Sequence, residues 1–421
     1  MEQKTELIGL HIDPKSLRVR LDIREPTFYN NPYPYYEAIR KVSPFFYWED
    51  YDKWTFLDHK DINAILRDRR FGRQISHVVP EDSPLVIKPS PELKPFYEAE
   101  KFSLLQLEPP DHSRLRGLVQ KAFMSRQIER LRPRIEQMSR DYCDQMEDAM
   151  AQNGQCNLKE IFATPIPVMV IADMLGVPSS MAPDLLNWSH AMVKMYEPSC
   201  TPENQQLAVK AANDFFDYLK RFIGERRKNL KEDLISHLIQ VEEEGEKLTE
   251  HEMICNCILL LNAGHEATVN VVGNGIFNLL QQRDKWDQWL GDPSLNRTAV
   301  EELMRYDTPL HIFDRWVLQD LEYNGIQFKQ GNEVSLVLGA GNRDPKVFDQ
   351  SDQLVLDRPK NQHVSLGGGI HFCIGAPLAR LELQTSLPIL MARFPHLQLA
   401  EQPQYANSYH FHGLETLLVS K

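Results

Sequence analysis

Cys373 is one of six cysteines, and its surroundings could make its sulfur reactive. It closes the segment SLGGGIHFC, which contains the consecutive glycines Gly367, Gly368 and Gly369. Consecutive glycines let a backbone pass close to a flat or bulky group, and a helical pattern that begins just after the cysteine would direct amide N–H groups at its sulfur. Both features favour a thiolate.

Three chemistries use such a thiolate, and the spacing of the neighbouring residues separates them. A phosphatase-type loop needs an arginine six residues after the cysteine, but Ala379 occupies that place and Arg380 comes one residue late. A dinucleotide-binding loop needs a third glycine where Phe372 stands. The remaining use is as an axial ligand of haem iron, where an electron-rich sulfur helps to cleave the O–O bond of dioxygen. A buried, inert cysteine beside a tight turn is the structural alternative.

A second stretch whose residue types could take part in chemistry lies in the middle of a long predicted helix. Residues 261–268 read LNAGHEAT, so Gly264, Glu266 and Thr268 stand where a helix through a core needs aliphatic side chains. Glycine in a helix costs about 1 kcal/mol relative to alanine, and a buried carboxylate is destabilising unless it is paired. The stretch is therefore either a functional site or a partly exposed helix that tolerates the acid.

The cysteine segment resembles the haem-ligand signature of the cytochromes P450, Phe-x-x-Gly-x-x-x-Cys-x-Gly. Gly369, Cys373 and Gly375 match this signature, and Leu366 stands where phenylalanine is usual.

Two further motifs are similar to those of the same family, in the same order and spacing. Glu302 and Arg305 match Glu-x-x-Arg, and Ala263, Gly264 and Glu266 match Ala-Gly-x-Glu-Thr on the central helix. Similarity to bacterial members also appears in EPPDHSRLR at 108–116 and GNRDP at 341–345. The resemblance covers the chain from about Asn31 to its carboxyl end.

The resemblance implies a b-type haem with Cys373 as its proximal thiolate ligand and metal-binding residue. Gly369 and Gly375 would let the loop lie near the porphyrin. The two haem carboxylates need cationic or hydrogen-bonding partners. By family position, the candidates are His112, Arg116, Arg315, His363 and His371. A structural ion-pair network of Glu302, Arg305 and Arg358 is also implied.

The resemblance also implies roles for the middle of the central helix. Ala263 and Gly264 would keep the helix face small where oxygen binds, and Glu266 would supply the acid that relays protons. Ala267 replaces the usual threonine, and Thr268 cannot substitute for it because one residue along a helix is a rotation of about 100°. We therefore expect a proton path through ordered water or through a hydroxyl group of the substrate.

The implied activity is that of a haem-thiolate monooxygenase that inserts one oxygen atom from O2 into an apolar organic small molecule. Ala267 adds the hypothesis that this substrate carries a hydroxyl near the oxidised carbon. Apolar candidates for substrate contact are Phe102, Val193, Leu310, Phe313 and Leu414, for which plain core packing is the alternative. Two polar residues that could orient a substrate are His311 and His412.

Electrons are expected from NAD(P)H through a ferredoxin reductase and a ferredoxin, because the sequence has no flavin or iron–sulfur spacing of its own. Basic residues that could receive a small acidic partner are Arg114, Lys121 and Arg380. Three other hypotheses remain. They are a haem-thiolate sensor without turnover, a P450 that uses hydrogen peroxide, and a cysteine hydrolase. For the hydrolase, the sequence shows no oxyanion-binding group and no residue that would orient His371 as the base.

The periodicity of the chain predicts a mostly α protein with smaller β-sheets. The resemblance implies the cytochrome P450 fold, as a single large domain over residues 1–421. The helical part is expected mainly at 112–305 and 375–394, and the β-rich part mainly at 45–57 and 310–360. A capping box, Thr249 followed by Glu252, predicts the start of the central helix, which can continue to about Gln282. A long loop is expected between about Gly72 and Lys94.

Composition excludes several classes of protein. The 47 basic and 59 acidic residues give a net charge of −12, which argues against a nucleic-acid partner. No apolar run approaches the roughly 20 residues that span a bilayer, and the first residues do not form a signal peptide. We therefore expect a cytoplasmic protein with no membrane partner.

Overall fold

The computed structural model describes residues 7–86, 88–197, 200–243 and 248–421. These residues group into two compact units. The first unit contains the described residues up to Val78, with Gly273–Cys373 and Leu399–Leu417. The second contains the described residues of Val79–Val272, with Ile374–Gln398 and Leu418–Lys421.

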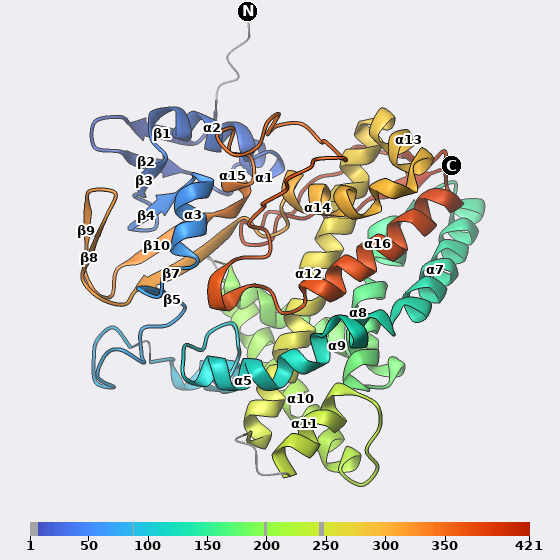
Figure 1. The fold of residues 1–421 in the computed structure, drawn as a ribbon, viewed down its shortest axis with the longest axis horizontal. Helices are drawn as coiled ribbons and strands as arrows, with labels where there is room; N and C mark the ends of the chain where they lie inside the picture. The colour runs from blue at the N-terminus through green and yellow to red at the C-terminus, as the bar shows by residue number, and fades with distance from the viewer. Residues whose placement is uncertain (1–6, 87, 198–199, 244–247) are drawn as a thin grey trace, which may run out of the picture. The chain divides into compact units, whose positions relative to one another are not determined.

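In its described residues the first unit is built on a seven-stranded mixed sheet of order β1-β2-β3-β4-β10-β7-β5 (Figure 1). The strands are β1 (Leu10–Asp13), β2 (Arg18–Leu21), β3 (Phe45–Trp48), β4 (Lys53–Phe56), β5 (Phe71–Gly72), β7 (Ile312–Val317) and β10 (Glu333–Val337). The pairs β2–β3 and β4–β10 are parallel, and the other neighbours are antiparallel. A separate hairpin joins β8 (Leu321–Tyr323) to β9 (Ile326–Phe328).

Both faces of this sheet are covered by hydrophobic clusters. Val334 and Leu336 of β10 pack in one cluster with Ile62, while Val337 packs in another with Trp48. Neighbouring residues of a strand point to opposite faces, so one strand can contribute to both clusters. The helices of this unit are α1 (Pro26–Asn30), α2 (Tyr33–Val42), α3 (His59–Ile65), α13 (Arg283–Gly291), α14 (Asn296–Tyr306) and α15 (Leu338–Gly341), with 3-10 turns at Pro293–Leu295 and Gly369–His371.

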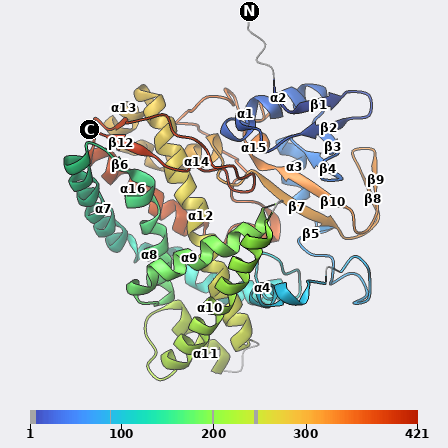
Figure 2. The same ribbon diagram turned by 180° about the vertical axis from the view of Figure 1, so that it is seen from behind.

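The second unit is mainly helical (Figure 2). Its helices are α4 (Lys94–Glu100), α5 (Asp111–Val119), α6 (Ser125–Glu129), α7 (Arg132–Asn153), α8 (Pro165–Leu175), α9 (Ala182–Val193), α10 (Pro202–Arg226), α11 (Leu234–Glu243) and α16 (Ala376–Arg393). Its 3-10 turns are Pro91–Leu93, Gln120–Phe123, Ser179–Met181 and Lys194–Tyr196, and Lys159–Ala163 is a π-helical turn. A short antiparallel pair joins β6 (Cys156–Asn157) to β12 (Leu418–Ser420), and β11 is Gln398–Leu399.

Aromatic contacts fix helix α9 against α10. The ring of Trp188 on α9 lies 5.2 Å from that of Phe215 and 5.8 Å from that of Tyr218, both on α10. Such pairs stabilise a helix contact beyond the apolar area they bury. This packing matters for the site below, because α9 also carries His190.

The central helix is α12 (Glu250–Gln281), and its capping box is confirmed. The N–H of Thr249 donates to Oε2 of Glu252 at 2.8 Å, and the N–H of Glu252 donates to Oγ1 of Thr249 at 3.2 Å. Arg114 on α5 also donates to Oε1 of Glu252 at 2.5 Å. The first turn of α12 is therefore held both by its own cap and by a neighbouring helix.

The mostly α character with small sheets is confirmed, but several short elements were not predicted. The strands β1 and β2 precede the expected β-rich part, and the second β-rich part ends at Val337 instead of near residue 360. Strands of four residues show only two periods of alternation, so their pattern is weak. The expected loop between Gly72 and Lys94 contains a 3-10 turn, and α4 follows it directly. The single-domain assignment stays a prediction.

Among the described residues, no helix combines the length and the apolar character needed to cross a bilayer.

Candidate active site

The cysteine segment forms a closed loop in the first unit. The N–H of Cys373 donates to the carbonyl of Leu366 at 2.9 Å, and the N–H of Phe372 donates to that of Gly369 at 3.2 Å. Cys373 forms no disulfide and is partly exposed. The loop therefore fixes the backbone at Cys373 while the residue stays accessible to a ligand.

Two glycines of this loop have a backbone that other residues rarely adopt. Gly367 has φ +70° and Gly369 has φ +64°. A Cβ at Gly369 would also overlap the carbonyl oxygen of Leu66, at the end of α3. Gly369 therefore makes its close approach to the end of α3, and contact of the loop glycines with a porphyrin stays a prediction.

Burial disfavours the thiolate form of the other five cysteines. Burial raises the pKa of Cys143, Cys255 and Cys257 to about 12 and that of Cys156 to about 11. Burial also raises the pKa of Cys200. Because the thiolate is the ligand form, Cys373 is the best candidate for an iron ligand.

Glu302, Arg305 and Arg358 form a buried network in the first unit. Arg305 donates from Nε and Nη2 to the Glu302 carboxylate at 2.8 and 2.7 Å, and Arg358 donates from Nε at 3.0 Å. Burial disfavours the ionised carboxylate, but these hydrogen bonds outweigh it and hold the pKa of Glu302 below its ordinary value. Arg305 also donates to the carbonyl oxygens of Asn342, Ser351 and Gln353. The network thus ties α14 to the chain that leads towards the cysteine loop.

Four of the residues expected to hold haem carboxylates divide between the units. In the second unit, His112 is buried with 1% of its surface exposed, and Arg116 follows one turn later on α5. In the first unit, Arg315 is buried on β7 with 3% exposed, and His371 ends the 3-10 turn before Cys373. Their contacts with a haem stay predictions.

His363 is engaged elsewhere in the first unit. Its Nε2 lies 3.1 Å from Oε2 of Glu301 on α14. An acidic partner at this distance competes with a haem carboxylate for the imidazole of His363.

The middle of α12 has an accessible face. Ala263 is exposed and Glu266 and Ala267 are partly exposed, while His265 and Thr268 are buried. Residues three and four apart share a helix face, so Ala263, Glu266 and Ala267 lie together. Thr268 is 6% exposed and lies on another face. The only side chain of this accessible trio that carries a proton-transferring group is therefore Glu266.

Gly264 has a packing role that the motif does not reveal. A Cβ at this position would lie 2.6 Å from Cγ1 of Ile171 on α8. The two helices cross so closely that only glycine fits without a shift. Its expected role beside the iron stays a prediction.

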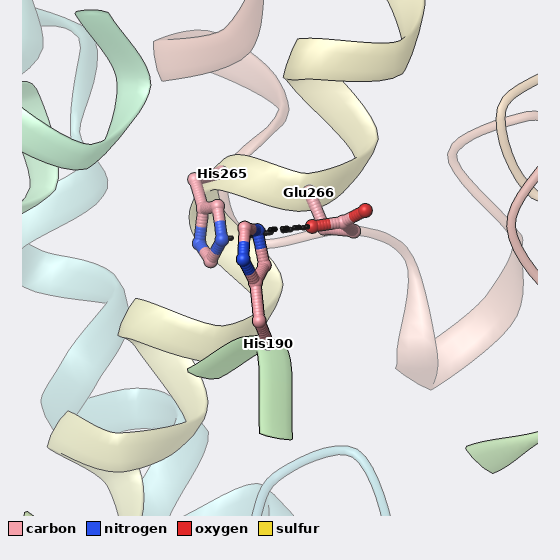
Figure 3. Close-up of side chains that lie close together, drawn as sticks. All are labelled: His190, His265 and Glu266. Atoms are coloured by element: carbon pink, nitrogen blue, oxygen red, sulfur yellow. Dashed lines mark ion pairs between the residues drawn. The ribbon is translucent and has the colours of Figure 1, made fainter. Parts of the chain in front are cut away.

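Glu266 lies beside two histidines (Figure 3). Its Oε2 is 3.5 Å from Nε2 of His190 on α9 and 3.6 Å from Nε2 of His265. Burial opposes ionisation of Glu266, but the hydrogen bond with His190 and the charges of His265 and His190 outweigh it and lower its pKa. The carboxyl group is therefore ionised at neutral pH. No signal in the sequence pairs His190 with Glu266, because α9 is remote from α12 along the chain.

The predicted substrate contacts differ in exposure. Leu414 is 1% exposed and Val193 is 8% exposed, which favours core packing for both. Phe102, Leu310 and Phe313 are partly exposed. Contact of any of the five with a substrate stays a prediction.

A buried polar cluster around Asp307 in the first unit was not predicted. Tyr33 and Tyr405 donate to its carboxylate at 3.0 and 2.5 Å, and Nε2 of His412 lies 3.3 Å from Oδ1. The rings of His311 and His412 are 4.4 Å apart. Both histidines are thus engaged inside this unit, which weakens the expectation that they orient a substrate.

Comparison with known proteins decides the family. The sequence profile described as Cytochrome P450 matches residues 88–288 and 294–415. The chain belongs to the cytochrome P450 family. The polyketide biosynthesis cytochrome P450 PksS of Bacillus subtilis (strain 168) is 35% identical over 403 residues, covering 93% of this chain and 96% of PksS. The vitamin D(3) 25-hydroxylase of Pseudonocardia autotrophica is 33% identical over 408 residues, covering 95% and 96%.

Solved structures agree with this assignment. The crystal structure of P450BioI in complex with an acyl carrier protein ligated to hexadec-9Z-enoic acid superposes with a TM-score of 0.86 at 32% identity, covering 94% of this chain and 100% of that one. The P450 fold is thereby confirmed. The chain is a haem-thiolate monooxygenase that acts on an organic compound. As a member of the family it uses haem and O2 and receives electrons from a redox partner.

The residues present fit a haem. Within the first unit, the cysteine loop offers an accessible sulfur donor, and Arg315 and His371 offer the guanidinium and imidazole donors that carboxylates need. The exposed Ala263 and the partly exposed Glu266 and Ala267 interrupt the buried residues of α12, as expected where a helix lines a cofactor or substrate space.

Proposed function

We propose that the protein oxidises an organic compound that carries a hydroxyl or similar oxygen close to the oxidised carbon, with Cys373 as the thiolate ligand of haem b. The single observation that carries this proposal is Ala267, which lies on the accessible face of α12 where a proton-relaying hydroxyl is usual in the family.

The haem supplies the oxidising chemistry, by which dioxygen is cleaved and one oxygen atom enters a C–H bond of the substrate. The polypeptide binds and orients the substrate and delivers protons. Glu266 is the proton-transfer residue, since it lies one turn from Ala263 on the accessible face and contacts the half-exposed His190. His190 gives Glu266 a route to solvent.

Ala267 leaves this route without a final hydroxyl group. Thr268 does not restore it, because its side chain is buried on another face of α12. An oxygen on the substrate completes this proton-transfer path. The same oxygen also orients the substrate in the site. Substrates without such an oxygen should therefore consume reducing equivalents with little product.

Two observations support an oxygen-bearing substrate with an apolar body. One relative is named for polyketide biosynthesis, and polyketides combine carbon chains with regularly placed oxygens. The partly exposed Phe102, Leu310 and Phe313 supply apolar and aromatic surface of the kind that lines ligand pockets.

The proposed electron source is NAD(P)H through a ferredoxin reductase and a ferredoxin. Lys121 is exposed beside α5 and could meet an acidic ferredoxin, whereas Arg114 is already bound to Glu252 and Asp111. Lys121 is therefore the stronger docking candidate of these two.

The test compares wild type with Ala267→Thr, each with a hydroxyl-bearing substrate and with its deoxygenated analogue. Product formed per reducing equivalent is measured in all four combinations. The proposal predicts good coupling of the wild type with the hydroxylated compound alone, and improved coupling of Ala267→Thr with the analogue. Equal coupling in all four combinations would exclude a role for substrate oxygen.

A P450 that uses hydrogen peroxide is the alternative to exclude, because peroxide itself carries the electrons and protons that dioxygen would receive from outside. It predicts full turnover with peroxide and no reductant, and unchanged turnover in Glu266→Gln. A haem-thiolate sensor predicts no product under either condition.

A further inference from the structure

Three potential metal ligands converge in the second unit (Figure 3). One ring nitrogen of His190, one ring nitrogen of His265 and a carboxylate oxygen of Glu266 all lie within 4.8 Å of one another. The residues come from two helices, since His190 is on α9 and the other two are consecutive on α12. Two imidazoles and one carboxylate are a donor set that zinc uses in proteins.

The hydrogen bond of His265 fixes which of its nitrogens can bind a metal. Nδ1 lies 2.8 Å from the carbonyl oxygen of Leu261, one turn earlier on α12. A carbonyl only accepts, so Nδ1 carries a proton, and in the neutral imidazole Nε2 keeps the lone pair that a metal ion would bind. This arrangement, with the far nitrogen bound to a backbone carbonyl, is the one that orients histidines at metal centres.

Nε2 of His265 is buried and makes no hydrogen bond to any described residue. The residue is 2% exposed. Its Nε2 faces Oε2 of Glu266 at 3.6 Å, which is too long for a hydrogen bond. A buried lone pair aimed at a carboxylate oxygen is unfavourable, and a cation between the two atoms would satisfy both.

The distances suit a tetrahedral ion. Zinc lies about 2.0–2.2 Å from nitrogen and oxygen ligands, so two ligands at a tetrahedral angle are about 3.3–3.5 Å apart. Oε2 of Glu266 is 3.5 Å from Nε2 of His190 and 3.6 Å from Nε2 of His265. These two distances already match, and the ligand nitrogens of the two histidines lie within 4.8 Å of each other, so the half-exposed His190 would turn towards His265 to complete the site.

We propose that His190, His265 and Glu266 bind a divalent transition-metal ion, for which zinc is the expected occupant, with water in the fourth position. The side chain of His190 is 47% exposed, so the ion can enter from solvent on this side. Bound metal links α9 to α12 at the point where the accessible face of α12 carries Glu266.

The site would regulate turnover, a consequence that rests on the proton-transfer role proposed above for Glu266. A carboxylate that ligates zinc cannot pass protons, so bound zinc should suppress product formation. The binding site itself does not depend on that role.

Zinc binding to the haem-loaded protein tests the site directly. Equilibrium dialysis with zinc is carried out on wild type, His190→Asn and the control His396→Asn, which alters an exposed histidine far along the chain from the cluster. His190 is half-exposed, so its replacement should leave the fold intact. The expected result is one tightly bound zinc ion in wild type and in the control, and a zinc affinity at least about 100-fold weaker in His190→Asn. Loss of an outer-shell partner alone weakens metal affinity by up to about 100-fold, and His190 would be a direct ligand.

Equal zinc affinity in wild type and His190→Asn, or no tight zinc in wild type, would overturn the proposal. A second variant, His265→Gln, must weaken zinc in the same way. Product formation is then measured with and without zinc. Tight zinc binding that leaves wild-type turnover unchanged would support the metal site and refute the proton-transfer role of Glu266.

Discussion

Glu382 on α16 buries a carboxyl group that has no hydrogen-bond partner among the described residues. Burial raises its pKa to about 8, so the group is largely protonated at neutral pH. An unfolded glutamate ionises near pH 4.5. Between these values the folded state holds a proton that the unfolded state has lost, so stability falls as pH rises, by about 1.4 kcal/mol per pH unit, and levels off above the folded pKa.

The neutral variant Glu382→Gln should remove this dependence. We expect thermal unfolding of the variant and of wild type to differ little at pH 5, and the variant to be the more stable at pH 8. The exposed control Glu401→Gln should follow wild type at both values. A difference between wild type and Glu382→Gln that stays constant from pH 5 to pH 8 would contradict a protonated Glu382.

Single residues were predictable where a motif carries them. Cys373 and Glu266 stand out by type and spacing, and Ala267 stands out as a departure from the family pattern. Their neighbours could not be predicted. His190 contacts Glu266, and Tyr405 contacts Asp307, only because packing brings remote segments together.

At the scale of elements, the crossing of α12 and α8 depends on Gly264. We expect Gly264→Ala to destabilise the protein by about 1–3 kcal/mol, because the new Cβ would meet Ile171. Gly273→Ala on the same helix is the matched control. A Cβ there meets nothing within 4 Å, so helix propensity should stabilise it by up to about 1 kcal/mol.

Chemical denaturation of the two alanine variants checks this prediction. Combining Gly264→Ala with Ile171→Ala should cost less than the sum of the two single changes, because the second substitution removes the atom that Cβ would strike. Equal stability of Gly264→Ala and Gly273→Ala would show that the crossing tolerates a side chain.

The elements themselves were predictable in proportion to their length. The central helix was expected from Thr249 to about Gln282 and runs from Glu250 to Gln281. A cap and eight turns of apolar periodicity define such a helix. The strands β1 and β2 were not predicted, because each has only four residues and stability there comes from sheet pairing.

At the scale of the whole molecule, some of the site residues implied by the family resemblance belong to one compact unit and some to the other. Cys373, Arg315 and His371 belong to the first, while His112 and Glu266 belong to the second. Neither unit alone contains both the proposed sulfur donor, Cys373, and the proposed proton-transfer residue, Glu266. The order of the motifs along the chain predicted that the protein belongs to one family. It could not predict how the chain divides into two compact units.

The central claim is that the sulfur of Cys373 ligates haem iron. The most direct measurement is the absorbance spectrum of the reduced, carbon-monoxide-bound protein for wild type, Cys373→Ser and the control Cys200→Ser, which alters another partly exposed cysteine. We predict a Soret band at the position typical of thiolate ligation in wild type and in the control, and loss of that band together with turnover in Cys373→Ser. An unchanged band and unchanged turnover in Cys373→Ser would contradict the account.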